Sequence, residues 1–338
     1  MTYKRGKITA ACIVGIMGLS LLAGCGQAGA DTPQAEAQVN VFTSEMSLGN
    51  VSIEDEAVAL AEAPSSPTLF SMPQASGTLV KENDRAQIDY SNTKDGYVMV
   101  RYSAASDKKL KSQVKGPSGT TYTYNLKAGA TEWETFPLSD ENGEYKVTVY
   151  QNTSGSKYAT VLSVTFSVEM ADPFAPFLRP NQYVNYETGA ENTVAKAKEL
   201  CDGKKTTLDK IRAVYNFVVT TLTYDKEKAA NIQSGYLPVL DEALETKKGI
   251  CFDYAAMMAG MLRSQGIPCK LIVGYAGSAY HSWLNVYTEE SGWINSAVFF
   301  DGTTWKLMDP TFASSGNQSS DIMKYIGDGS NYTSKYIY

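Results

Sequence analysis

The chain has 338 residues and a formal net charge of −6 at neutral pH. That length suits two domains better than one, and a hydrophobic content of 43% can supply a core for each. The negative charge disfavours a nucleic-acid partner, because a phosphate backbone attracts a basic surface. Five cysteines, none in a Cys-x-x-Cys pair, argue against a disulfide scaffold and a zinc ribbon. The single histidine, His281, excludes a metal site built from several imidazoles.

Residues 1–24 have the pattern of an export signal. Lys4, Arg5 and Lys7 precede an apolar stretch from Ile8 to Ala23, which is short for a membrane-spanning helix. The stretch ends in Leu22-Ala23-Gly24-Cys25, which resembles the lipobox of bacterial lipoproteins. The resemblance implies cleavage before Cys25 and its lipidation, so we expect a chain lipid-anchored to the extracytoplasmic face of the cell membrane. The alternative is an ordinary secretory signal with an incidental cysteine.

Residues 25–78 have the composition of a flexible acidic tether. Between Gly26 and Val80 there are seven acidic residues and no Lys or Arg, and Ala, Ser, Pro and Gln dominate. Such a segment buries too little apolar surface to offset the entropy lost on ordering. We therefore expect a linker that holds the following domains away from the membrane.

Residues 79–170 alternate in hydrophobicity, as strands of a β-sandwich do. Turn residues separate expected strands at 97–102, 109–115, 120–126, 131–137, 144–151 and 159–168. The segment from Glu141 to Tyr150 resembles the late strands of immunoglobulin-like modules, although the cysteine pair of antibody domains is absent. We expect an immunoglobulin-like β-sandwich that acts as a spacer or a binder, with Trp133 in core or rim packing. Residues 171–192 form the expected linker, because Pro173, Pro176 and Pro180 favour extended chain.

Residues 193–338 change to helical texture and then to strands. A capping-box signal at 206–209 opens an amphipathic helix, and a shorter helix is expected over 239–246. Gly249 permits a turn before Cys251, and the helical pattern after Cys251 stops at Gly266-Ile267-Pro268. Cys251 therefore falls in the first turn of a helix, where the dipole favours a thiolate. Strands are expected at 270–275, 281–287, 292–299 and 304–308, and the tail from Tyr325 to Tyr338 as a final strand or strap.

Three motifs in this region resemble the transglutaminase-like superfamily. Gly-Ile-Cys-Phe-Asp-Tyr-Ala opens the helix at Cys251, His281-x-Trp-x-x-Val-Tyr lies on a strand, and Asp309-Pro-Thr follows the next strands. The resemblance implies a papain-like α+β core, in which Cys251 is the nucleophile, His281 the base and Asp309 the orienting acid. The fold class expected for the whole chain is α+β, a β-sandwich followed by a transglutaminase-like papain-fold domain.

The chemistry of such a site is attack of a thiolate on an amide carbonyl, with the imidazole moving the proton. The backbone N–H of Cys251 is the expected oxyanion donor, and Tyr215 and Tyr224 are both candidates for a second. We expect no cofactor and no metal, since Cys251 and His281 alone offer too few zinc ligands. Cys201 and Cys269 are expected to pack in the core, with a disulfide between them as the alternative.

The expected function is that of a cysteine peptidase or amidase acting on a peptide or protein amide at the cell envelope. Two alternatives stay open: an amine-accepting transglutaminase that cross-links, and a non-catalytic envelope protein that binds a peptide or glycan. Hydrolysis is favoured because the sequence shows no calcium loop or acceptor site. Gly274, Gly277 and Ser278 also suggest a flexible rim and an open cleft before His281.

Overall fold

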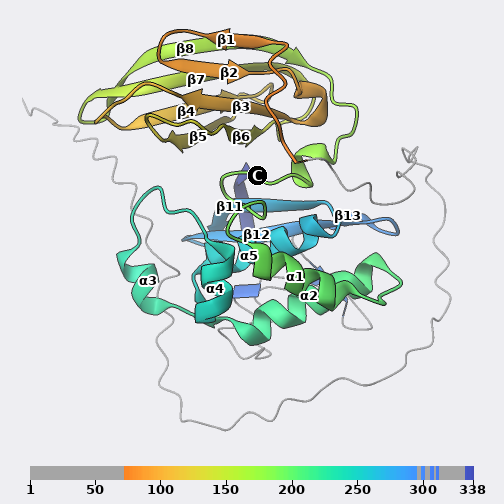
Figure 1. Ribbon diagram of the computed structural model, residues 1–338. Coiled ribbons are helices and arrows are strands. Elements are labelled where there is room, and N and C mark those ends of the chain that lie inside the picture. Colours follow the sequence, from red (N-terminus) through yellow and green to blue (C-terminus); the bar gives the residue numbers. More distant parts are fainter. Residues whose placement is uncertain (1–71, 295–297, 301–304, 308–309, 312–331) are drawn as a thin grey trace, which may run out of the picture.

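The computed structural model describes residues 72–294, 298–300, 305–307, 310–311 and 332–338. The chain is mixed α+β: antiparallel sheets come first, and helices with a further antiparallel sheet follow (Figure 1). Residues 1–71, with the predicted signal, Cys25 and most of the predicted tether, lie outside the described residues. In the part of the chain that is described, no helix is long and apolar enough to cross a membrane.

Two four-stranded antiparallel sheets, here called the N-terminal sheets, have the strand orders β1-β2-β3-β6 and β5-β4-β7-β8. Residues alternate between buried and solvent-facing along β4 and β5, so one side of each strand faces the core. The six strands predicted here are confirmed within three residues at each end, while the immunoglobulin-like type stays a prediction. The strands are β1 (Val80–Glu82), β2 (Ala86–Asp89), β3 (Tyr97–Tyr102), β4 (Leu110–Lys115), β5 (Thr121–Leu126), β6 (Glu134–Pro137), β7 (Gly143–Ser154) and β8 (Lys157–Val168).

The following α+β region carries five helices among the described residues. Thr206 caps α2 by accepting a hydrogen bond of 3.1 Å from the Asp209 N–H, which confirms the predicted helix start. The predicted helix after Cys251 is also confirmed and ends before Gly266, whose φ is +75°. The helices are α1 (Glu191–Cys201), α2 (Thr207–Thr221), α3 (Lys226–Asn231), α4 (Leu240–Thr246) and α5 (Cys251–Ser264).

The main sheet of this region has the order β13-β12-β11-β16, and its central strands pack against α5. Tyr332–Ile337 pairs with β11, so the predicted tail strand is confirmed over the described residues. The elements of this sheet and of the smaller ladders are β9 (Thr223–Tyr224), β10 (Lys248–Gly249), β11 (Cys269–Ala276), β12 (Ala279–Thr288), β13 (Gly292–Ile294), β14 (Val298–Phe300), β15 (Trp305–Leu307) and β16 (Tyr332–Ile337).

The hairpin between β11 and β12 corrects one expectation about the glycines before His281. Gly277 and Ser278 form its two-residue turn, with φ of +59° at Gly277. Gly274 instead lies buried inside β11, opposite His281. A Cβ at Gly274 would lie 2.1 Å from the carbonyl oxygen of Thr333 and 2.8 Å from the Trp283 ring. Gly274 is therefore a residue of close packing and not part of a flexible rim.

The predicted linker contacts both the N-terminal sheets and the α+β region, and residues 175–181 of it are buried. Residues 175–177 form the short helix η2 (Ala175–Phe177), all three of them buried. Arg179 donates from Nε to the Asp95 carbonyl at 2.9 Å and forms an ion pair with the Asp95 carboxylate at 3.6 Å. The ring of Tyr183 lies 5.6 Å from Tyr124 of β5 and 4.4 Å from Tyr338.

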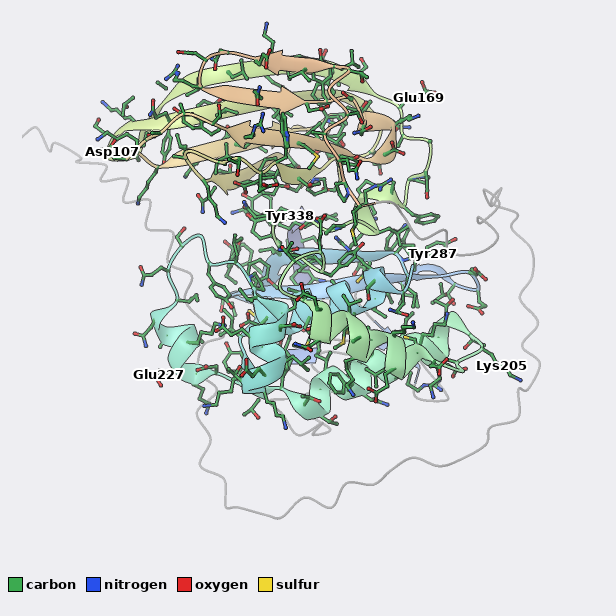
Figure 2. The ribbon with its side chains drawn as sticks, in the orientation of Figure 1. Asp107, Glu169, Lys205, Glu227, Tyr287 and Tyr338 are labelled. Atoms are coloured by element: carbon green, nitrogen blue, oxygen red, sulfur yellow. The ribbon has the colours of Figure 1, made fainter. Side chains whose placement is uncertain are left out.

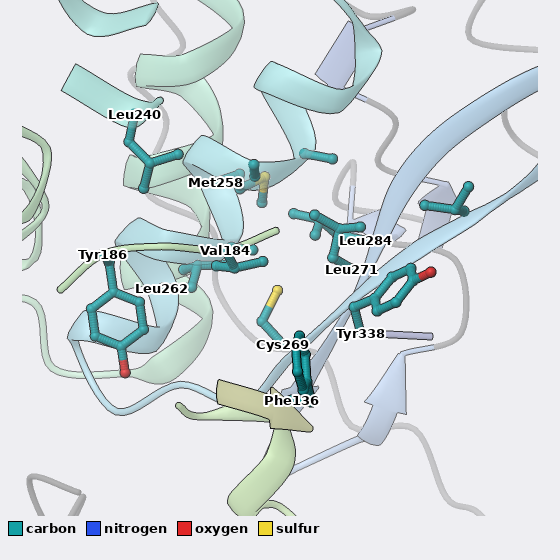
Figure 3. Close-up of a cluster of buried hydrophobic side chains, with 14 of the residues drawn as sticks. Phe136, Val184, Tyr186, Leu240, Met258, Leu262, Cys269, Leu271, Leu284 and Tyr338 are labelled. Atoms are coloured by element: carbon teal, nitrogen blue, oxygen red, sulfur yellow. The ribbon is translucent and has the colours of Figure 1, made fainter. Parts of the chain in front are cut away.

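Tyrosines make the direct contact between the N-terminal sheets and the α+β region. Tyr122 of β5 lies 5.8 Å from Tyr336 and 5.5 Å edge-on from Tyr338, measured between ring centroids. Tyr338 lies between the two parts of the molecule (Figure 2). Phe136 of the sheets and Cys269, Leu271 and Met258 of the α+β region belong to one continuous buried cluster (Figure 3). The two parts therefore share a core.

One buried cation joins four segments of this core. Arg263, in the last turn of α5, is 2% exposed. Its guanidinium donates four hydrogen bonds to main-chain oxygens: two to Cys269 at 3.0 and 2.7 Å, one to Arg179 at 2.9 Å and one to Tyr338 at 2.7 Å. Charge-assisted bonds of this kind are about twice as strong as neutral ones. Arg263 thereby ties α5 to β11, to the linker and to the tail.

We expect Arg263→Ala to lower the free energy of unfolding by about 3 kcal/mol or more, because buried carbonyls lose their donors. Arg263→Lys should recover little of it, since one ammonium group cannot reach three separated oxygens. Arg212→Ala is the matched control: Arg212 forms only a surface ion pair with Asp209, whose two side chains are 43% and 41% exposed. Urea unfolding of the three variants measures the difference, and equal losses for Arg263→Ala and Arg212→Ala would contradict this role.

Candidate active site

Cys251 is the first residue of α5, as the sequence predicts. Ile250 precedes it in extended conformation, and the chain then turns directly into the helix. The free N–H groups of a first helical turn, together with the helix dipole, stabilise a negative charge. Cys251 is partly exposed, whereas most of the helix after it is buried. A partly exposed sulfur at a helix start is the environment in which a thiolate is favoured.

A short β-ladder positions the segment that immediately precedes Cys251. β9 and β10 pair in parallel, so Tyr224 lies beside Gly249. The Asp225 N–H donates to the Gly249 carbonyl at 2.9 Å. A Cβ on Gly249 would lie 2.6 Å from the Cβ of Asp253, so only glycine leaves room for Asp253 here. Gly249 lies in β10, and the reason that glycine is required there is steric.

Asp253, two residues after Cys251, is a fully buried carboxylate with three partners. It accepts a hydrogen bond from the Ile250 N–H at 2.8 Å and another from the Tyr236 hydroxyl. Lys228 of α3 completes the set with an ion pair of 3.0 Å. Burial and the Asp253 charge both raise the pKa of Tyr236 above its ordinary value, so its hydroxyl keeps the proton that it donates. Asp253 therefore caps α5 from inside the protein.

His281 lies on β12, is 1% exposed and pairs with Gly274 of β11. Its ring stacks on Trp283, two residues along the same strand face, with centroids 6.3 Å apart and planes 18° from parallel. Tyr332 of β16 closes the group, 6.3 Å from His281 and 5.0 Å edge-on from Trp283. The aromatic rings of Trp283 and Tyr332 therefore pack against the imidazole and restrict its orientation.

The elements that carry Cys251 and His281 pack against each other, since α5 contacts both β11 and β12. Tyr280, the residue before His281, lies within electrostatic range of Cys251. Burial chiefly raises the pKa of Tyr280 to about 12, and nearby tyrosines and a charge on Cys251 add to the rise. Asp309, the predicted third residue, lies outside the described residues; Pro310 and Thr311, which follow it, are buried. Its role stays a prediction.

The other two cysteines of the described chain are buried free thiols. Cys201 lies at the end of α1, where burial raises its pKa. Cys269 begins β11, where burial raises its pKa to about 12. Both match the predicted core packing, and neither is paired in a disulfide.

The two candidates for a second oxyanion donor lie in different surroundings. Tyr215 is buried within the helical core, on α2. Tyr224 lies on β9, next to the segment that leads into Cys251. The ladder therefore favours Tyr224 over Tyr215 as the candidate near the nucleophile, and its role in catalysis stays a prediction.

The sequence interpretation did not identify Lys228 and Tyr236, which flank an open depression of about 480 Å³. The depression is lined by residues 228 and 231–236, at the end of α3 and in the loop after it. Tyr236 also lies 6.5 Å from Phe252, the neighbour of Cys251, measured between ring centroids. A buried Asp253 calls for a cationic or hydroxyl partner, but the sequence offers many such residues and does not distinguish them.

Part of the chain, including this site, is similar to a known protein family. The model of the transglutaminase-like superfamily matches residues 194–297. The uncharacterised protein YebA of Bacillus subtilis (strain 168) is 30% identical over 132 residues, which make up 33% of this chain and 17% of YebA. A protein-glutamine gamma-glutamyltransferase of Pseudomonas aeruginosa is 30% identical over 69 residues, 16% of this chain and 10% of that enzyme. The chain thus spans a small part of these two relatives.

Two solved structures are similar over a larger share of the chain, at low TM-scores. A presumed cysteine protease of Cytophaga hutchinsonii has a TM-score of 0.36 and 13% identity, covering 72% of this chain and 76% of that one. Red sea bream transglutaminase has a TM-score of 0.27 and 13% identity, covering 64% of this chain and 48% of that one. The segment that matches the family model, residues 194–297, includes both Cys251 and His281. The chain therefore contains a transglutaminase-like superfamily domain, which follows its N-terminal antiparallel sheets.

Proposed function

We propose that this protein is a thiol enzyme of the cell surface that attacks amide bonds through an acyl-enzyme on Cys251. The observation that carries the proposal is the placement of Cys251 as the partly exposed first residue of α5, a helix packed on the strand of His281. A cysteine that served only to pack the core would have no need of the helix start or of exposure.

The residues account for each step of amide cleavage. The Cys251 thiolate attacks the carbonyl carbon, and the Cys251 N–H stabilises the oxyanion that forms. His281, which holds the thiol proton, gives it to the departing amine, and a thioester remains on Cys251. Water then attacks the thioester, loses a proton to His281 and releases a carboxylic acid and the free thiol. Asp309 would hold the imidazole in the required tautomer.

We favour water over an amine as the acceptor, so that the activity is that of a peptidase or amidase. The partial exposure of Cys251 supports access of water to the thioester. The glycine rim supports it less, because Gly274 is a packed strand residue. The similarity to a protein-glutamine gamma-glutamyltransferase over 69 residues favours the alternative, in which an amine accepts the acyl group.

The location and the partners proposed for the protein follow from the N-terminal sequence. Leu22-Ala23-Gly24-Cys25 would place lipid on Cys25, and the acidic tether would hold the enzyme near peptide or protein substrates of the envelope. An anchor of acyl chains binds membranes through their buried CH₂ groups, independently of the fold.

Cys251 should be the fastest-alkylated thiol of the described region, by roughly a hundredfold at pH 7, because the pKa of Cys269 and Cys201 is raised. Cys269, with a pKa of about 12, forms a thiolate only as the pH approaches that value, so its labelling should rise steeply above pH 10. Site-resolved mass spectrometry after iodoacetamide treatment measures the rates. In urea the cysteines should be alkylated at similar rates. Equal rates at Cys201 and Cys251 in the folded chain would contradict the selective reactivity of Cys251.

Cys251→Ala should abolish turnover, and Asp309→Asn should reduce it by about 10⁴-fold through the wrong imidazole tautomer. A glutamine-containing peptide offered with and without excess primary amine, and analysed by mass spectrometry, separates the acceptors. Cleaved or deamidated product that disappears in Cys251→Ala supports hydrolysis. Predominant amine-linked product at modest amine concentration would make the protein a transglutaminase. Binding without any product would favour the non-catalytic envelope protein.

Cys25→Ser should release the protein from the membrane fraction without changing its melting temperature, because the composition of residues 25–78 predicts a tether outside the core. Fractionation of expressing cells and a thermal melt of the released protein measure the two effects. Retention of Cys25→Ser in the membrane fraction would contradict the lipid anchor.

A further inference from the structure

A carboxylate buried two residues from the proposed nucleophile poses an electrostatic problem. Asp253 is 0% exposed and lies in the same helical turn as Cys251. A buried negative charge in the first turn of the helix disfavours a second one there, because like charges repel more strongly where water does not screen them. Asp253 unopposed would therefore work against the thiolate that the helix start favours.

Lys228 supplies the opposing charge. Its ammonium group lies 3.0 Å from one carboxylate oxygen of Asp253 and 4.5 Å from the centroid of the Tyr236 ring. The side chain of Lys228 is 23% exposed, so the pair is shielded from water on the Asp253 side. Tyr236 donates to the other oxygen of the same carboxylate. The carboxylate thus meets one full positive charge and two hydrogen-bond donors.

The position of Lys228 is fixed by the β9–β10 ladder, which also positions the residues just before Cys251. Asp225 caps α3 by accepting a hydrogen bond of 2.8 Å from the Lys228 N–H. The Asp225 N–H in turn donates to the Gly249 carbonyl, one residue before the cap of α5. The first turns of α3 and α5 are therefore joined through main-chain atoms, and Lys228 faces Asp253 as a result of that junction.

Other titratable groups also face this end of α5, and none of them replaces Lys228. Tyr280 and His281 come from β12, and Tyr236 keeps its proton at neutral pH. The acidic groups within range of Tyr236, besides Asp253, are Glu242 of α4 and Asp225. These acids add negative charge to the surroundings and so increase the need for a cation beside Asp253.

We propose that Lys228 is a positioning residue for Cys251, which neutralises Asp253 and so keeps the start of α5 favourable to a thiolate at neutral pH. The inference rests on the proposed function of Cys251 as a nucleophile. It assigns a role to a lysine 23 positions before Cys251 in the sequence, through Asp253 and not through contact with a substrate.

The test is the pH dependence of iodoacetamide labelling at Cys251, measured on the full chain by mass spectrometry. Lys228→Met should raise the midpoint by about one pH unit and slow labelling about tenfold at pH 6, because Asp253 loses its counter-charge. Lys226→Met is the matched control: it removes an equal charge from an exposed position on the same helix and should leave the midpoint unchanged.

Two further variants separate electrostatics from a loss of structure. Asp253→Asn, which leaves Lys228 unopposed, should lower the midpoint below that of the unaltered protein. The double variant Lys228→Met/Asp253→Asn carries neither charge and should return it toward the original value. Opposite shifts from the two single variants, cancelling in the double, are not produced by general unfolding, which circular dichroism of each variant also monitors.

The inference is overturned if Lys228→Met and Lys226→Met give the same midpoint. It is also overturned if the double variant keeps the raised midpoint of Lys228→Met, since Lys228 would then act without Asp253. Labelling needs no natural substrate, so these outcomes are independent of turnover. If the midpoints shift as expected but no acyl-enzyme forms, the positioning role of Lys228 is supported and the proposed function is contradicted. If an acyl-enzyme forms but the midpoints do not shift, the proposed function is supported and the positioning role is contradicted.

Discussion

The buried guanidinium of Arg263 is the constraint on which most of the described structure depends. Its bonds to Cys269, Arg179 and Tyr338 bring together segments separated by up to 84 residues. Because a buried charge is stable only when its donors are satisfied, these main-chain oxygens have little freedom to move apart. The helix that carries Arg263 at one end carries Cys251 at the other, about 20 Å away along a rigid rod. The fold and the candidate site are thus held by the same element.

Each end of α5 carries a buried charged side chain that interacts favourably with the helix dipole. Asp253 lies in the first turn and Arg263 in the last, so each charge opposes the partial charge of the helix terminus near it. Both are buried, and between them the helix is apolar, with Ala255, Met257 and Met258 wholly inside the core. The difference is that Asp253 needs a partner from another helix, whereas Arg263 is satisfied by backbone alone.

Periodicity in the sequence predicted the elements that are long and one-sided. The helix after Cys251 and the strand of His281 have enough residues for their apolar pattern to be unambiguous. β1, β2 and α3 were not predicted, because three to six residues carry little pattern and their conformation depends on neighbours far along the chain. The partners of Asp253 were missed for a related reason: hydrophobic pattern says which face is buried, not which cation meets a buried acid.

Gly274 and the tyrosines show a second limit of sequence interpretation. A glycine in a sequence suggests flexibility, but at Gly274 the missing side chain provides the space that the Thr333 carbonyl and the Trp283 ring occupy. Tyrosines spread along strands gave no sign that Tyr122, Tyr124 and Tyr338 would meet in one contact between the two parts.

The position of β16 has a consequence for how the chain reaches its native state. The Arg263 bond to Tyr338 spans 75 residues, and β16 completes the sheet only after everything before it has been synthesised. The N-terminal sheets are joined largely by hairpin neighbours, so we expect them to fold early. They would then offer Tyr122 and Tyr124 as a surface on which the late segment docks. In a nascent chain, His281 would accordingly lack its contact with Tyr332 until β16 is in place, so the candidate site would be completed only by that late segment.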